Sequence, residues 1–151
     1  MQIKIRKATL ADRDTIASFQ VDMAWETEHY KLNFDTVKLG VGNALNDKNL
    51  GEYYVAEVNH TVIGSLFTTY EWSDWRNGTV VWIQSVFVSP DFRKRGVYAL
   101  LYGHVKNIVG NDASLCGIRL YVDKTNEAAQ QVYSRLGMDG DHYRVFEWMK
   151  Q

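Results

Sequence analysis

The segment TVVWIQSVFV (79–88) constrains the fold of this chain more than any other stretch. It is rich in β-branched and aromatic residues, a pattern that predicts a strand buried within a sheet. Two other strand-like segments, YYVAEV (53–58) and TVIGSLFTTYEW (61–72), precede it, and the short turns NH and RNG separate the three. Such turns predict antiparallel hairpins. We therefore expect the segment at 79–88 to be a central strand.

Helices and strands alternate after this central strand. Apolar residues recur at helical spacing from Gly96 onward, and a second short helix between Asn126 and Gly137 has the spacing of a buried face. Three further strands are expected, at 3–8, 117–122 and 144–149. Two further helices are expected, one that begins near Thr9 and one that spans 35–47. Together they predict an α/β (α+β mixed) fold: a mixed, mostly antiparallel twisted sheet of six to seven strands, with helices on both faces.

Length and composition predict one domain over residues 1–151. The chain has 46% hydrophobic residues and a single proline, which argues against disorder and against an interdomain linker. No apolar run is long enough for a membrane span, and the charged start MQIKIRKATLADRD is unlike a secretion signal, so we expect a cytoplasmic protein without a membrane partner. Cys116 is the only cysteine, and the four histidines lack metal-ligand spacing, so we expect no disulfide and no metal.

The positive charge of the chain is concentrated directly behind the central strand. The net charge is only −1, yet residues 81–110 contain four cations and one anion, and SPDFRKRG places Arg93, Lys94 and Arg95 in front of Gly96. A helix N-terminus with a preceding glycine binds phosphate through unpaired N–H groups, so this turn predicts a site for a diphosphate. Neither GxxxxGK[ST] nor GxGxxG is present, and no broad basic face indicates a nucleic-acid partner. The alternative is a solvated cationic turn.

Two motifs resemble those of the GNAT superfamily of acyl-CoA-dependent N-acetyltransferases. VSPDFRKRGVYALL is similar to the acetyl-CoA signature, a strand ending V-x-P followed by R/Q-x-x-G-x-G/A, with Arg93 and Gly96 at the motif positions. NEAAQQVYSRLGM, 33 residues further on, resembles the later signature N-x-x-A-x-x-x-Y-x-x-x-G-F/M through Asn126 and Tyr133. Tyr98 departs from the usual Gly or Ala, and its phenol either crowds the diphosphate or lies along the helix.

The resemblance implies the GNAT fold, acetyl-CoA as co-substrate and, because homodimers are common in the family, a homodimer. It also implies a bulged fourth strand whose backbone N–H groups hold the pantetheine and polarise the thioester. The coenzyme residues expected from the turn and the two motifs are Val86, Phe87, Val88, Arg93, Lys94, Arg95, Gly96, Val97, Tyr98, Asn126 and Tyr133. Asn126 contacts the pantetheine arm, caps its own helix, or does both.

The resemblance assigns Tyr133 as the acid that protonates the leaving thiolate, and the alternative is a core tyrosine. Several family members have a glutamate base six residues before the strand-ending valine, where this chain has Trp82. Gln84 lies two residues further on and cannot accept a proton at neutral pH. Glu71 and Asp74 are therefore the candidate bases, followed by Glu26 and Glu28, although each pair is also typical of solvated loop charge.

Aromatic residues interleave with these carboxylates. Acid beside an aromatic surface attracts a cationic amine through charge pairing and cation–π contact, so the expected acceptor residues are Glu26, Glu28, Trp72, Trp75, Trp82 and Gln84. The alternative is that the tryptophans cover a sheet edge or a dimer interface. The predicted function is acetyl transfer to a primary amine of a small molecule. The alternatives are a protein or peptide N-acetyltransferase and a non-catalytic acyl-CoA-binding module.

Overall fold

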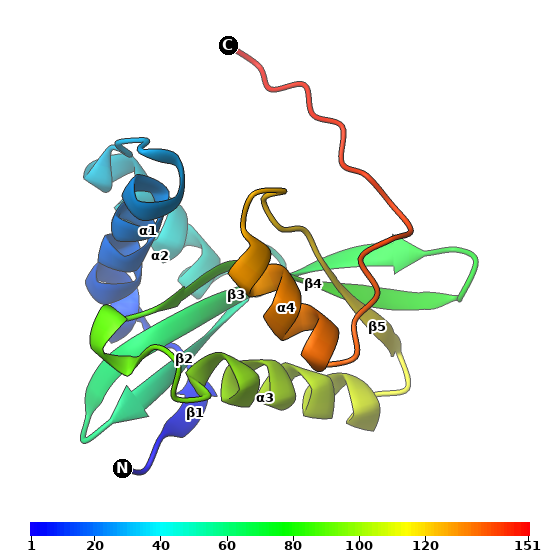
Figure 1. The fold of residues 1–151 in the computed structure, drawn as a ribbon, viewed down its shortest axis with the longest axis horizontal. Coiled ribbons are helices and arrows are strands. Elements are labelled where there is room, and N and C mark those ends of the chain that lie inside the picture. Colours follow the sequence, from blue (N-terminus) through cyan, green and yellow to red (C-terminus); the bar gives the residue numbers. More distant parts are fainter. The chain divides into compact units, whose positions relative to one another are not determined.

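Five strands form one mixed sheet in the order β1-β2-β3-β4-β5 in the computed structural model, which describes residues 1–151 (Figure 1). The strands are β1 (Lys4–Lys7), β2 (Glu52–Val58), β3 (Thr61–Ser73), β4 (Gly78–Val88) and β5 (Leu115–Leu120). The helices are η1 (Leu10–Asp12), α1 (Arg13–Glu28), α2 (Phe34–Asn46), η2 (Pro90–Phe92), α3 (Val97–Asn111) and α4 (Glu127–Arg135). The mixed α/β class predicted from the sequence is confirmed.

The chain divides into two compact units, Met1–Arg119 and Leu120–Gln151, which are described separately. In the first unit, β1 to β4 pair antiparallel along their lengths, as the short turns predict. Both hairpin turns place non-glycine residues in the left-handed region, Asn59 and His60 in the first and Asn77 in the second. Asparagine tolerates this conformation better than most residues, which explains why the chain reverses there.

The two faces of the sheet carry different helices. Tyr53 and Phe67 are stacked on the face that packs against α1 and α2, with ring centroids 4.2 Å apart. Tyr54 and Thr68, their immediate neighbours in sequence, point to the face covered by α3. This alternation is the period of two that a strand imposes on its side chains. This alternation, together with the register in which β3 pairs with β4, assigns each residue of the two strands to one face of the sheet.

An ionic cluster anchors the start of α1 to the sheet. The guanidinium of Arg6 in β1 donates to Asp12 at 2.8 and 3.1 Å and to Glu57 at 3.0 Å. Asp12 also accepts from the Thr9 backbone N–H at 2.8 Å, as part of a capping box between Thr9 and Asp12. The side-chain hydrogen bond from Arg6 lowers the pKa of Asp12 despite the opposing effect of burial. The cluster therefore joins β1, β2 and the first helix.

In the second unit, α4 has a well-defined beginning and end. The Asn126 side chain accepts from the Ala129 N–H at 3.1 Å, and Gly137 has a φ of 88° where the helix ends, as expected of a glycine stop signal.

The predicted strand at 144–149 is wrong for the single chain, which has five strands instead of six to seven. The helical and strand patterns were read from side chains, but a strand also needs a neighbouring edge to pair with its backbone. No such pairing occurs after Arg135. The expected strand at 117–122 begins and ends two residues earlier, at Leu115–Leu120. No helix of the structure has the length and apolarity that a membrane crossing requires.

Candidate functional site

The turn between β4 and α3 has the backbone geometry of an anion-binding site. Lys94 and Gly96 both have left-handed φ values, 62° and 79°, and Gly96 is the N-cap of α3. The hydrogen bond from Leu100 N to Gly96 O, 3.1 Å, joins the first turn of α3 to its N-cap, and a helix N-terminus of this kind can present backbone amides to an anion. No side chain caps this end, and no acidic residue occupies the first turn. A Cβ placed on Gly96 would meet nothing within 4 Å, so the space beside this residue is open.

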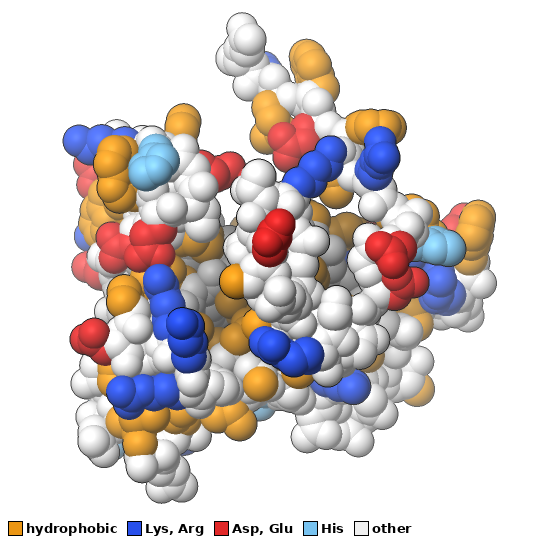
Figure 2. Space-filling view, in the orientation of Figure 1, with side chains coloured by type: hydrophobic (Ala, Val, Ile, Leu, Met, Phe, Trp, Pro, Cys, Tyr) orange, Lys and Arg blue, Asp and Glu red, His pale blue; other side chains and the backbone are white.

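Cationic side chains surround this helix end. Lys94 and Arg95 are exposed, and the Arg95 guanidinium lies 5.7 Å from the ring centroid of Phe92. Figure 2 shows Lys and Arg side chains, in blue, gathered where the chain enters α3. The partial positive charge of the helix N-terminus adds to these charges. The arrangement provides amides, a helix dipole and two flexible cations for a phosphorylated group.

Arg93 has a different environment from the next two cations. Its Nε donates to the Val88 carbonyl at 2.8 Å, its NH2 group donates to Glu26 Oε2 at 2.8 Å, and its guanidinium lies 5.4 Å from the Phe87 ring centroid. The side chain therefore joins the end of β4 to the C-terminal turn of α1. These contacts use two of the five N–H donors of the guanidinium.

The ring of Tyr98 lies along the helix. It is stacked on Tyr102, four residues further along α3, with ring centroids 6.2 Å apart. The sequence left two orientations open for the phenol, toward the diphosphate or along the helix. The ring has the second, toward the next helical turn. The departure from Gly or Ala at position 98 is therefore compatible with the open space at Gly96.

β4 carries the bulge that the sequence resemblance implies. Ser65 pairs with Phe87, but two residues later on β3, Phe67 pairs with Gln84, so β4 contains one extra residue in this interval. Ser85 has a φ of 56°, which marks the bulge in β4 next to Val86. A bulge interrupts the ladder and leaves backbone groups of the longer strand without their usual partners. The extra residue of β4 lies in the interval between Gln84 and Phe87.

Three predicted residues share one face of the sheet beside this bulge. Phe67 pairs with Gln84, Thr69 with Trp82 and Glu71 with Val80, and opposed residues of an antiparallel pair point the same way. This is the face of Phe67, which packs toward α1 and α2. Glu71, Trp82 and Gln84 therefore form one row, which we call the acceptor row.

Arg119 completes the acceptor row and was not predicted. It extends from β5 and forms an ion pair with Glu71 of β3. No sequence signal indicates this pair, because the residues are 48 positions apart and meet only through the order of the strands. The carboxylate of Glu71 thus faces a cation already, and a cationic ligand there would compete with Arg119.

The other predicted acceptor residues and the second candidate base, Asp74, lie elsewhere. Trp72 is the next residue of β3 after Glu71, so its side chain points to the opposite face of the sheet. Asp74 and Trp75 are exposed in the turn between β3 and β4, and Glu28 is exposed at the end of α1. Glu26 belongs to the Arg93 contact described above. The structure therefore brings Glu71, Trp82 and Gln84 together and does not bring the remaining residues to them.

The second unit contains Asn126 and Tyr133 of the later motif. Asn126 caps α4, as one of its two expected roles requires. Tyr133 is half-buried, and its carbonyl accepts hydrogen bonds from Leu136 N and Met138 N at 3.1 Å each at the end of the helix.

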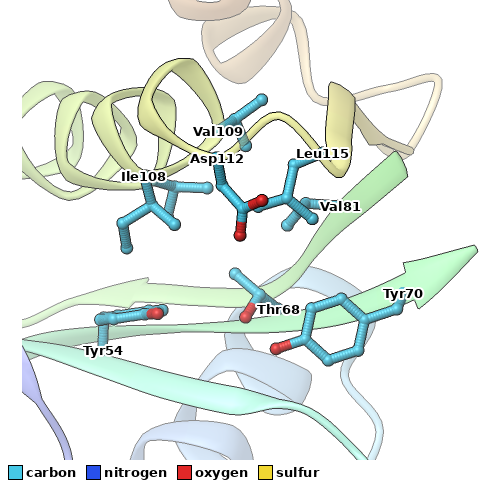
Figure 3. Close-up of a pocket in the computed structure, with 9 residues that line it drawn as sticks. Tyr54, Thr68, Tyr70, Val81, Ile108, Val109, Asp112 and Leu115 are labelled. Carbon is cyan, nitrogen blue, oxygen red and sulfur yellow. The ribbon is translucent and has the colours of Figure 1, made fainter. Parts of the chain in front are cut away.

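A cavity of about 220 Å³ lies on the opposite face, between the sheet and the C-terminal half of α3 (Figure 3). Its lining residues are Tyr54, Thr68, Tyr70, Val81, Val105, Ile108, Val109, Asp112 and Leu115. Asp112 points from the end of α3 toward the sheet, and its carboxylate accepts from Ser114 N at 2.9 Å and Ser114 Oγ at 2.6 Å. None of the predicted site residues lines this cavity. The structure also contains no group of three or more His, Cys, Asp or Glu side chains arranged to hold a metal ion.

Comparison with known proteins places the chain among acetyltransferases. The profile of the Acetyltransferase (GNAT) family matches residues 10–138. A possible acetyltransferase from Clostridium difficile 630 is 40% identical and superposes with a TM-score of 0.92, a match that covers 100% of this chain and 99% of that chain. None of the curated proteins matches the sequence.

Two more distant structures share the fold. An aminoglycoside N-acetyltransferase in complex with CoA is 19% identical, with a TM-score of 0.80 over 99% of this chain and 95% of that one. A ribosomal-protein-alanine N-acetyltransferase from Brucella melitensis biovar Abortus 2308 is 14% identical, with a TM-score of 0.80 over 99% of this chain and 100% of that one. These two act on different classes of amine, so the shared fold does not select between a small molecule and a protein.

Proposed function

This chain belongs to the Acetyltransferase (GNAT) family, and from that premise we propose that it transfers acetyl from acetyl-CoA to a primary amine of a small molecule, as a cytoplasmic homodimer. The observation that carries the proposal is the left-handed turn at Gly96, which opens α3 beside the bulged strand β4. Family membership implies acyl-CoA-dependent acetyl transfer, and the CoA complex of the aminoglycoside enzyme supports this coenzyme.

The turn fits the diphosphate of the coenzyme. The N-terminus of α3 can offer backbone amides to an anion, Gly96 has no Cβ to exclude an approaching oxygen, and Lys94 and Arg95 supply charge. Bound acetyl-CoA would supply an activated acetyl thioester. The backbone N–H groups near Val86 and Val88 would hold the pantetheine and polarise the thioester carbonyl, where negative charge develops.

The acceptor row favours a cationic acceptor. Trp82 presents an indole face, Gln84 a donor and acceptor, and Glu71 a negative charge that Arg119 holds in place. Because Glu71 pairs with Val80, five β4 positions from Ser85, it lies about 16 Å from the bulge along the strand. We therefore assign Glu71 to holding positive charge on the acceptor and to accepting the amine's proton through intervening water. Asp74, in the hairpin turn, lies further away than Glu71, so it is the weaker candidate base.

Proton removal from the amine is the demanding step. An alkylammonium of pKa about 10.4 costs about 4.6 kcal/mol to deprotonate at pH 7. Attack by the neutral amine then forms the amide bond and breaks the thioester bond, and the thiolate leaves. We propose that Tyr133 gives its phenolic proton to this thiolate, which rests on its place in the later motif.

The experiment that tests the proposal measures thiol release from acetyl-CoA with a panel of polyamines, aminoglycosides, amino acids and peptides. We expect turnover with at least one small amine that carries a second positive charge. Turnover restricted to peptide N-termini would favour the protein-acetylating alternative.

Replacement of Tyr133 by Phe separates an enzyme from a non-catalytic module. In an enzyme kcat falls about 10²-fold or more while calorimetric affinity for acetyl-CoA is retained. Tight acetyl-CoA binding without thiol release for any amine, together with no measurable effect of Tyr133→Phe, would assign the chain to the acyl-CoA-binding class.

A further inference from the structure

The cavity between the sheet and the C-terminal half of α3 takes no part in the proposed reaction. It has a volume of about 220 Å³ and lies on the face of the sheet opposite to the acceptor row (Figure 3). All of its lining residues belong to the first unit, Met1–Arg119, so this unit alone forms its walls. An apolar cavity of about 150 Å³ is large enough to bind benzene. The space therefore has room for an aromatic ring with a short substituent.

Aromatic rings and hydroxyl groups line the sheet side of the cavity. Figure 3 shows Tyr54 and Tyr70 on either side of Thr68, facing the end of α3. The Thr68 hydroxyl already donates to the Glu52 carbonyl at 3.0 Å. Burial raises the pKa of Tyr54 to about 12 and also raises the pKa of Tyr70, so both phenols are neutral at pH 7. The sheet side therefore offers ring faces and hydroxyl groups without charge.

Asp112 supplies the only charge among the lining residues. Its Oδ1 accepts from Ser114 Oγ at 2.6 Å and from Ser114 N at 2.9 Å, and these hydrogen bonds lower the pKa of the carboxyl, so it is ionised at pH 7. Its other oxygen, Oδ2, has no hydrogen-bond or ion-pair partner in the chain. Glu52 and Lys7, whose charges act on the phenol of Tyr70, pair with each other at 3.1 Å. The cavity therefore has a negative charge that no side chain neutralises.

The end of α3 adds to this negative charge. Asp112 is the C-cap of the helix, and the last turn contains no basic residue. A helix C-terminus carries about half a negative charge and is stabilised by cations, so a carboxylate at this position is disfavoured. A cation bound beside Asp112 would interact favourably with both the carboxylate and the helix end.

The rest of the lining is aliphatic and consists of Val81, Val105, Ile108, Val109 and Leu115. A metal ion needs several oxygen ligands at once, which one free carboxylate oxygen and two neutral phenols among aliphatic groups do not provide. An organic ammonium group needs only one carboxylate and gains further from an adjacent aromatic ring, while its hydrocarbon part packs against aliphatic walls. The lining therefore favours an organic cation over a metal ion.

We propose that this cavity binds a small organic cation with an apolar body. The ammonium group lies at Asp112, beside the rings of Tyr54 and Tyr70, and the apolar body packs against the aliphatic walls. The cavity shares no residue with the Gly96 turn or with the acceptor row. Its ligand is therefore separate from the acceptor amine, and the proposal is independent of acetyl transfer.

NMR titration of the ¹⁵N-labelled full chain, without acetyl-CoA, tests this site with benzylammonium, benzyl alcohol and benzoate. The three ligands share a ring and differ mainly in charge. We expect benzylammonium to bind in the millimolar range or more tightly, with amide shifts centred on residues 105–115 and 68–70. Benzyl alcohol should bind about 10-fold more weakly, because it lacks the charge that pairs with the carboxylate, and benzoate should not bind.

Three variants identify the groups that bind the ligand. Asp112→Asn removes the charge and keeps an oxygen that can accept from Ser114, so benzylammonium should bind about 10-fold more weakly while the affinity for benzyl alcohol is unchanged. Glu71→Gln is the matched control, because it changes the net charge equally but lies on the acceptor row, and it should bind benzylammonium as the unmodified protein does. Val109→Phe fills the cavity and should abolish binding of both ligands.

The outcomes that would overturn the proposal are distinct. Equal affinities for benzylammonium and benzyl alcohol, or an unchanged affinity of Asp112→Asn for benzylammonium, would refute recognition of the charge. Shifts centred on the acceptor row and lost in Glu71→Gln would assign the ligand to the acceptor site. Absence of binding by the unmodified protein would show that the cavity is only a gap in packing. If Val109→Phe does not fold, as judged by circular dichroism, the comparison of Asp112→Asn with Glu71→Gln still decides. Acetyl transfer can be present in any of these cases.

Discussion

Substitution of Gly96 tests the proposed phosphate turn, and the structure allows the backbone and charge effects to be separated. Gly96→Ala places a Cβ in open space, so its cost comes from the left-handed φ of 79° and should lower the free energy of unfolding by about 1–2 kcal/mol. Gly96→Glu has the same backbone cost and adds a carboxylate. A unit charge about 6 Å from a phosphate charge costs about 2.8 kcal/mol at an effective dielectric constant of 20, which is about 100-fold in affinity.

Isothermal titration calorimetry with acetyl-CoA measures this difference. We expect Gly96→Ala to bind within about 10-fold of the unmodified protein and Gly96→Glu to bind about 100-fold more weakly than Gly96→Ala. Gly110→Glu is the matched control, because it changes the net charge by the same amount as Gly96→Glu. Gly110 also has open space beside it and lies about 21 Å from Gly96 along the same helix, beyond the Debye length. Equal affinities of the Ala and Glu variants at position 96 would refute diphosphate binding at this turn.

Three other predictions concern charged contacts. Asp12→Asn should lower the free energy of unfolding by about 1–3 kcal/mol at pH 7. Because Arg6 lowers the pKa of Asp12, the stabilisation by the charged Asp12 carboxylate is complete above pH ~4 and is lost as pH falls through the lowered pKa. Urea titrations of the variant and of the unmodified protein should therefore converge in acid. A double-mutant cycle of Glu26→Gln and Arg93→Ala should give a coupling of about 0.5–1 kcal/mol that disappears in high salt, since both side chains are about 40% exposed. Glu71→Gln should raise the KM for a dicationic amine about 10-fold and also lower kcat, since Gln cannot accept the amine's proton, and an unchanged KM would remove Glu71 from the acceptor row.

The phosphate turn could be predicted from the sequence because its determinants are local. A left-handed N-cap favours a glycine, a helix N-terminus exposes amides irrespective of its surroundings, and the cations are neighbours of Gly96 in the chain. The hairpins were predictable for the same reason, since Asn59 and Asn77 provide left-handed turns within a few residues of the strands that they connect. The α4 boundaries likewise follow from Asn126 and Gly137, which act on adjacent backbone groups.

The features that were not predicted depend on pairs far apart in the chain. The Glu71–Arg119 ion pair requires that β5 lie beside β4, and the face shared by Glu71, Trp82 and Gln84 requires the register of β3 against β4. Position along the sequence suggested that Asp74 would join Glu71, yet the hairpin turn separates them. The segment 144–149 shows the same principle, because its pattern is that of a strand and no pattern in one segment specifies where its partner edge lies.

The cationic run at 93–95 illustrates how neighbouring like charges acquire different roles. Repulsion among three adjacent cations is reduced when one of them is paired, and Arg93 is the one whose reach includes both the Val88 carbonyl and Glu26. This contact fixes the end of β4 and the end of α1 against each other, which fixes the direction in which the next residues enter the turn. Lys94 is the next residue in the chain and has a left-handed φ, and Gly96 is the N-cap of α3. We therefore propose that Arg93 acts on the coenzyme through the geometry of the turn, and that Lys94 and Arg95 act through their charge. Lysine at position 93 could not reproduce this role, because it lacks the planar fork that reaches a carbonyl and a carboxylate at once.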